Sequence, residues 1–182
     1  DTDSIYLNLG DLVESVYKGR EKTDESVVRF LDKVCQTKFE PFIESSYEEL
    51  AEYVGAYEQK MIMKRENIAD KGIWTAKKRY ILNVWDSEGV RYTKPKLKVM
   101  GIECVKSSTP GACRDKIKEC LTVIMNEDEE AAQSFIKTFR ENFSELPVED
   151  ISFPRGCNNL NKWANTSSIY SKGTPIHVRG AL

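Results

Sequence analysis

Two aspartates at the start of the chain have the spacing of a metal-binding pair. Asp1 and Asp3 directly precede an apolar run in the sequence DTDSIYLNL, and in an extended backbone their side chains project to the same side. Two carboxylates this close repel each other unless a cation neutralises them. Magnesium takes oxygen ligands, often one or two carboxylates together with substrate phosphates. The pair therefore indicates a magnesium site in which two ions assist a phosphoryl transfer.

Other interpretations of this aspartate pair compete with magnesium. An EF-hand loop fails because Ile5, Tyr6 and Leu12 stand where that loop requires an oxygen ligand, a glycine and a glutamate. A glycosyltransferase that carries a nucleotide sugar on a metal also uses an Asp-x-Asp triplet. A solvated turn without any metal describes most such triplets. The spacing alone leaves the last two interpretations open.

The bulk composition limits the class of protein. The chain has 182 residues, 40% of them hydrophobic, and a formal net charge of −2, which suits one domain or two small ones. It has no 18-residue apolar run, so we expect no membrane span and no membrane partner. Five cysteines without a Cys-x-x-Cys pair and a single histidine, His177, offer no zinc constellation. This cysteine usage indicates a reducing, intracellular compartment.

The periodicity of the first half predicts a strand and then a long helix. Ser4–Leu9 alternates between polar and apolar residues, which predicts a short strand. The polar stretch 10–26 is typical of a connection. Helical spacing then continues from Ser26 to about Tyr57, and Pro41 should kink or divide that helix.

The second half predicts a hairpin followed by helices. Trp74–Trp85 and Val90–Val105 are rich in β-branched and aromatic residues, and the turn DSEG separates them. A helix should start at Pro110, with Ser108 or Thr109 as its cap. A second helix follows it, so β character gives way to α near residues 104–109.

Basic residues concentrate in the predicted hairpin. Residues 71–106 contain nine basic and three acidic side chains, a net charge of +6, which leaves −8 for the rest. Alternation along a strand places Lys94, Lys96 and Lys98 on one face. It likewise places Lys78 and Tyr80 together, with Lys77 and Arg79 opposite. Such a lysine row suits contact with a phosphate backbone, although lysines also protect sheet edges and solvated faces.

Four stretches in the same order resemble family B DNA polymerases, in particular the replicative polymerases of T-even-type bacteriophages. DTDSIY is similar to motif C of the catalytic palm, and WTAKKRYILNVWDSEG to the segment with the KKRY motif. PKLKVMGIECVKSSTP resembles the passage from palm to thumb, and PIHVRGAL resembles part of the thumb. The resemblance implies an α+β fold: the C-terminal part of a palm, with antiparallel strands and a long helix, over residues 1–106. A mainly helical, N-terminal part of a thumb would follow over residues 107–182.

The resemblance also implies roles for individual residues. Asp3 matches the aspartate that ligates both catalytic magnesium ions, and Asp1 matches its less directly involved neighbour. Glu66 is a third candidate metal residue, with a surface glutamate as the equal alternative. The remaining matches are expected DNA contacts, at the primer end and the duplex backbone: Lys77, Lys78, Arg79, Tyr80, Lys106, Ser107 and Ser108.

The implied reaction transfers a nucleotide from a dNTP to a primer 3′-hydroxyl, directed by a template, in viral DNA replication. The start at Asp1 and the lack of motifs A and B imply a fragment, so we expect a missing N-terminal polymerase portion as partner and no activity from the chain alone. Primer–template DNA and dNTP are the other expected partners, and the cytoplasm of an infected bacterial host is the expected location. The alternative is a non-catalytic primer–template-binding subunit that complements a separately encoded N-terminal half.

Overall fold

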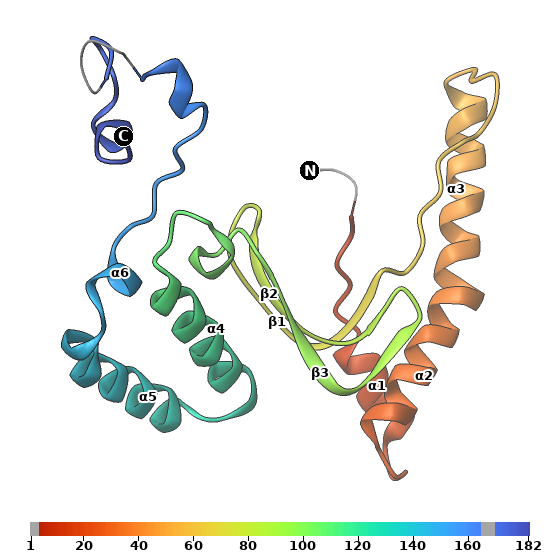
Figure 1. Ribbon diagram of the computed structural model, residues 1–182. Coiled ribbons are helices and arrows are strands. Elements are labelled where there is room, and N and C mark those ends of the chain that lie inside the picture. The colour runs from red at the N-terminus through yellow and green to blue at the C-terminus, as the bar shows by residue number, and fades with distance from the viewer. Residues whose placement is uncertain (1–3, 165–169) are drawn as a thin grey trace. The chain divides into compact units, whose positions relative to one another are not determined.

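The structure, a computed structural model, describes residues 4–164 and 170–182 of the chain. The chain divides into two compact units, Asp1–Met100 and Gly101–Leu182. The first unit combines helices with an antiparallel sheet, and the second is mainly helical (Figure 1). The predicted α+β class is therefore confirmed.

The first unit begins differently from the sequence prediction. Residues 4–9 form no strand, and Ile5, Tyr6 and Leu7 are exposed. Helix α1 (Gly10–Tyr17) follows where a connection was predicted, and it buries Val13. The strand prediction is wrong because alternation produces a strand only where a neighbour takes up the backbone hydrogen bonds. None of the strands in the described part of the chain pairs with this segment.

Two further helices are divided at Pro41, as predicted. Helix α2 (Asp24–Val34) begins with a side-chain capping box. A π-helical turn (Cys35–Phe39) separates it from α3 (Glu40–Tyr53), so the two helices form one interrupted rod in Figure 1. Proline lacks an N–H, and its ring clashes with the carbonyl one turn earlier. The wider turn before Pro41 accommodates that missing hydrogen bond.

Helix α3 ends earlier than predicted, because Gly55 provides a left-handed stop. Its φ is 64°, a conformation that glycine adopts without steric cost. The Gly55 amide donates to the Glu52 carbonyl at 3.1 Å, and the Ala56 amide donates to the Ala51 carbonyl at 2.8 Å. These two bonds form a Schellman motif, so the helix stops before the predicted end at Tyr57.

The sheet contains three antiparallel strands in the order β1-β2-β3. Strand β2 (Arg79–Ser87) and β3 (Val90–Met100) form the predicted hairpin, which turns at Glu88 and Gly89. Strand β1 (Asn67–Ala76) forms a second hairpin with β2. The stretch predicted as one strand, Trp74–Trp85, therefore turns back on itself at Lys77 and Lys78. The sequence KK contains none of the usual turn residues, which is why this turn was not predicted.

An ion cluster of four side chains joins helix α2 to the sheet. Arg65 donates from Nη2 to Asp32 Oδ1 at 2.7 Å, and from Nη1 to Asp86 Oδ1. Arg91 lies 3.4 Å from Asp32 Oδ2 and 3.5 Å from Asp86 Oδ2. Asp86 is fully buried and Arg65 is nearly so. Burial lowers the pKa of Arg65, but hydrogen bonds to Asp32 and Asp86 outweigh burial and raise it.

The side chain of Trp74 covers Gly72, the one glycine of β1. An added Cβ at Gly72 would lie 2.6 Å from the Trp74 ring and 2.9 Å from Leu82 Cδ2. Leu82 is the partner of Gly72 in the register of β1 and β2 and is buried. Glycine at position 72 thus lets the indole lie against Leu82, on one face of the sheet.

The second unit is built around helices α4 (Gly111–Asn126) and α5 (Glu129–Asn142). Pro110 is the N-cap residue of α4 and no side chain caps that helix, so the predicted cap at Ser108 or Thr109 is wrong. The extended backbone of Pro110, with ψ 144°, ends the preceding loop instead. The shorter elements are α6 (Val148–Ile151), α7 (Ile176–Arg179) and 3₁₀ turns at Glu103–Val105, Phe143–Glu145 and Leu160–Lys162. Nowhere in the described residues is a helix both long and apolar enough to cross a bilayer.

The ion cluster predicts a large loss of stability when one carboxylate is removed. Asp86→Ala leaves Arg65 buried with half of its partners, and breaking a buried pair in this way costs about 3–5 kcal/mol. Urea unfolding monitored by circular dichroism measures the loss. The control is Glu44→Ala, at an exposed position of α3, which should unfold near the wild-type midpoint. Equal midpoints for both variants would contradict the structural role of the cluster.

Candidate nucleic-acid interface

The aspartate pair lies outside the described residues. Asp1 and Asp3 belong to the segment 1–3, so their geometry is not part of the structure. Within residues 4–164 and 170–182, no group of three or more histidine, cysteine, aspartate or glutamate side chains could hold a metal. The magnesium site therefore stays a prediction from the sequence.

The KKRY motif occupies a tight turn and the start of β2. Lys77 and Lys78 form the turn between β1 and β2 and are exposed, and Lys78 has φ 63°. Arg79 pairs with Ala76 as the first residue of β2. The expectation that Lys78 shares a strand face with Tyr80 is wrong, because alternation does not extend through a turn. The motif instead presents two lysines at one end of the hairpin.

Tyr80 belongs to an aromatic cluster on the sheet face that carries Trp74. The Tyr6 ring meets Trp74 edge-on at a centroid distance of 5.1 Å, and it meets Tyr80 at 5.8 Å. Burial, a hydrogen bond with Tyr6 and the nearby negative charge of Glu66 together raise the pKa of Tyr80 to about 12. Trp74 remains 51% exposed. The cluster thus presents aromatic surface to solvent beside the basic turn.

Glu66 lies at the beginning of β1 and is paired with a lysine from β3. Lys98 Nζ lies 2.5 Å from Glu66 Oε1. The hydrogen bond from Lys98 lowers the pKa of Glu66, against a smaller opposing effect of burial. Because Asp1 and Asp3 lie outside the described residues, the assignment of Glu66 to the metal site stays a prediction.

The three lysines of β3 have different surroundings. Lys98 bonds to Glu66, and Lys96 Nζ lies 4.2 Å from the centre of the Tyr92 ring. Lys94 is exposed. The register shifts between the partners of Val84 and Asp86, so strict alternation does not hold over this part of the strand. The lysine row predicted from alternation is therefore not a uniform surface.

The remaining predicted contacts lie in the second unit. Lys106, Ser107 and Ser108 are exposed and precede helix α4. Lys106 Nζ pairs with Glu103 Oε1 at 3.0 Å, and the Lys106 carbonyl accepts from the Thr109 amide at 3.1 Å. These residues form a turn closed by that backbone hydrogen bond, and both serines are exposed.

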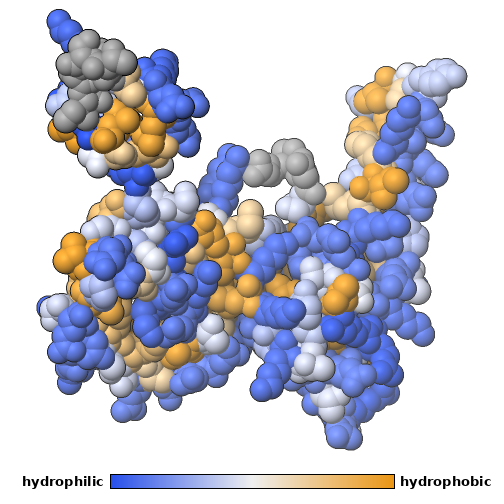
Figure 2. All heavy atoms as spheres, viewed as in Figure 1, coloured by the Kyte–Doolittle hydropathy of each residue, from blue (hydrophilic) through white to orange (hydrophobic). Residues whose placement is uncertain are grey.

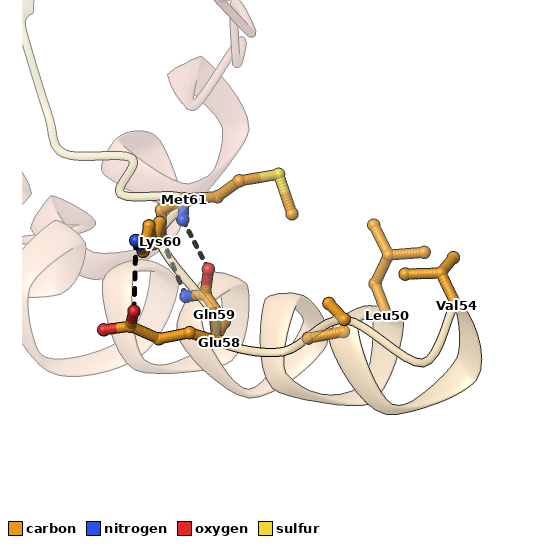
Figure 3. Close-up of a pocket in the computed structure, with 8 residues that line it drawn as sticks. Leu50, Val54, Glu58, Gln59, Lys60 and Met61 are labelled. Atoms are coloured by element: carbon orange, nitrogen blue, oxygen red, sulfur yellow. Dashed lines mark hydrogen bonds and ion pairs between the residues drawn. The ribbon is translucent and has the colours of Figure 1, made fainter.

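A cavity of about 260 Å³ lies at the far end of α3. Its labelled lining in Figure 3 combines aliphatic side chains from the helix with a polar loop. Glu58 pairs with Lys60 at 3.1 Å, and the Gln59 amide donates to the Met61 carbonyl at 2.8 Å. Figure 2 shows hydrophobic side chains at this end of the helix. Because the polar groups of the loop bond to one another, the cavity has no arrangement that suggests chemistry.

Sequence reasoning missed two residues of the aromatic face. Tyr6 was assigned to a strand, and Lys98 was assigned to a row of phosphate contacts. The available signal was the Gly-x-Trp spacing at residues 72–74, since a glycine two residues from a tryptophan on a strand leaves space for the indole on the same face.

Comparisons with known proteins identify two relatives. The chain is 40% identical to the "DNA-directed DNA polymerase" of Escherichia phage RB69 and 36% identical to that of Enterobacteria phage T4, in alignments of 190 positions each. Each alignment covers 100% of this chain but 21% of the relative. The chain thus spans about one fifth of the length of these relatives. No protein-family model matches it.

The aromatic cluster predicts a change in the titration of Tyr80. Tyr6→Phe removes the hydroxyl partner but keeps the ring, so the pKa of Tyr80 should fall from about 12 partway towards the ordinary value of about 10. Burial is the largest cause and remains. Alkaline titration of ¹³Cζ-labelled tyrosine by NMR measures the change, and Tyr17→Phe, at a ring paired with Phe30, is the control. An unchanged Tyr80 pKa in Tyr6→Phe would refute the hydroxyl contact.

Proposed function

We propose that this chain, a homologue over its whole length of one segment of the family B DNA polymerases of phages RB69 and T4, is a palm and thumb-base portion of a DNA-directed DNA polymerase. The observation that carries the proposal is identity of 36–40% in alignments that cover the whole chain, and so both of its units. The proposed reaction is template-directed nucleotidyl transfer in an infected bacterial cell.

The catalytic part of the proposal rests on Asp1 and Asp3. Their carboxylates would hold two magnesium ions, which supply charge neutralisation at the reacting phosphate. Two carboxylates leave further coordination positions of the ions open, and Glu66 pairs with Lys98. We therefore propose that the remaining ligand comes from a separate polymerase portion that carries motifs A and B.

The DNA-binding part of the proposal rests on the basic turn. Lys77 and Lys78 are exposed at the end of a rigid hairpin, and the half-exposed Trp74 lies on the adjoining strand. Lysines can hydrogen-bond the minor-groove acceptors that every base pair offers, so they check geometry without reading sequence. Tyr80 would lie beside the primer end, and Lys106, Ser107 and Ser108 would contact the duplex backbone.

A second candidate function is binding without catalysis. The exposed lysines of the turn and the half-exposed Trp74 form a basic, aromatic surface, which also suits a primer–template-binding subunit that complements a separately encoded half. Mixing experiments separate the two functions, because only the polymerase portion restores DNA synthesis.

Complementation predicts which aspartate is essential. The isolated chain should not extend a primer, and adding a polymerase portion with motifs A and B should restore dNTP- and magnesium-dependent extension. Asp3→Asn in this mixture should abolish extension yet leave duplex affinity near wild type, because the carboxylate serves the metals. Extension at wild-type rates by Asp3→Asn would refute the metal assignment, and extension by the chain alone would refute the need for a partner.

The basic turn predicts a loss of primer–template affinity. Lys78→Ala should weaken binding about tenfold, since a hydrogen bond to a charged group contributes about 1.5 kcal/mol. Fluorescence anisotropy with a labelled primer–template measures the affinity. Lys38→Ala removes an exposed lysine from the π-helical turn and should bind like the wild type. Equal losses in both variants would show that only overall charge matters.

A further inference from the structure

The ion pair between Glu66 and Lys98 links two segments that are far apart in the sequence. Lys98 lies opposite Leu82 in the register of β2 and β3, so it shares the sheet face that carries Trp74. Its side chain is 31% exposed, and that of Glu66 is 55% exposed. The pair therefore lies at the margin of the aromatic cluster, partly shielded from solvent.

Tyr80 is the neighbour of this pair on the same face. It lies two residues before Leu82 on β2, and side chains two residues apart on a strand share a face. The negative charge of Glu66 acts on the Tyr80 hydroxyl, which also bonds to Tyr6. Lys98 and Tyr80 thus share one face of the sheet, and the charge of Glu66 is close enough to act on the Tyr80 hydroxyl.

The backbone of Glu66 is held in place from both sides. The preceding residue, Arg65, is fixed by Asp32 and Asp86. The Glu66 carbonyl accepts from the Glu88 amide at 2.6 Å. The carboxylate therefore has a fixed base, and its two side-chain partners are Lys98 from β3 and the neighbouring Asn67.

We propose that Lys98 is a positioning residue: it holds the Glu66 carboxylate on the sheet face that carries Tyr80 and does not itself contact DNA phosphate. The proposal rests on the proposed function, because it assigns Tyr80 to the primer end. It gives the lysines of β3 different roles, because Lys98 pairs with the Glu66 carboxylate at 2.5 Å, whereas Lys94 is exposed. Surface ion pairs with no further role contribute little to stability, so the test needs readouts that a passive pair would not change.

The salt dependence of DNA binding distinguishes positioning from direct contact. Each lost phosphate contact lowers the slope of log affinity against log salt by about one. Lys98→Met in the full 182-residue chain should leave the slope unchanged while it weakens primer–template binding several-fold, and Lys98→Arg should restore the affinity. Lys94→Met is the matched control, an exposed lysine of the same strand. A slope reduced by about one in Lys98→Met, or wild-type affinity in that variant, would overturn the proposal.

A second measurement tests the pair without DNA. Urea unfolding of Glu66→Gln, Lys98→Met and the double variant forms a thermodynamic cycle. The double variant should lose less stability than the sum of the two single variants, because each single change already removes the contact. Additive losses would overturn the pairing. Failure of the wild-type chain to bind primer–template would instead overturn the proposed function. The unfolding cycle needs no DNA, so it would still test the Glu66–Lys98 pair in that case.

Discussion

The buried contact between Arg65 and two aspartates is the constraint on which the first unit depends. Asp32 comes from helix α2 and Asp86 from β2, so one guanidinium joins the helical rod to the sheet. Asp86 also accepts from the Gly89 amide at 3.0 Å, which ties the β2–β3 turn to the same point. Buried charges are tolerated only when they are paired and hydrogen-bonded, and Arg65 bonds to both carboxylates here while Arg91 pairs with the same two from the sheet. Arginine suits this position because its planar fork can serve two acceptors at once.

This constraint also affects the proposed DNA-binding face, because Arg65 and Glu66 are neighbours in the sequence. Arg65 is nearly buried, and the Glu66 carboxylate pairs with Lys98 on the sheet. The sheet then carries Tyr80 and Trp74 on that face and the two lysines at its end. A hairpin with a basic tip and an aromatic face suits a duplex. Lysine contacts to phosphates would position the protein, and lysine contacts to minor-groove acceptors would not depend on the base sequence. Helices α2 and α3 are mainly acidic and apolar, so the sheet carries the surface that we propose for DNA.

Local chemistry explains which features the sequence could predict. Pro41 interrupts the helix wherever it stands, and the alternating β2 and β3 around Gly89 need only their own residues to form a hairpin. The strand expected at residues 4–9 failed because pairing is not a local property. The turn at Lys77 and Lys78 was missed because a lysine adopts φ 63° there, which intrinsic preference disfavours. The Arg65 cluster joins residues up to 59 positions apart, and no spacing rule connects them.

The central claim is that the sheet end with the KKRY turn faces DNA. Titration of the ¹⁵N-labelled chain with a primer–template duplex, followed by amide chemical shifts, tests it most directly. We expect the largest changes in amide chemical shift at Lys77, Lys78 and Tyr80, and no changes in helices α2 and α3. Shifts confined to those helices, with the turn unaffected, would contradict it.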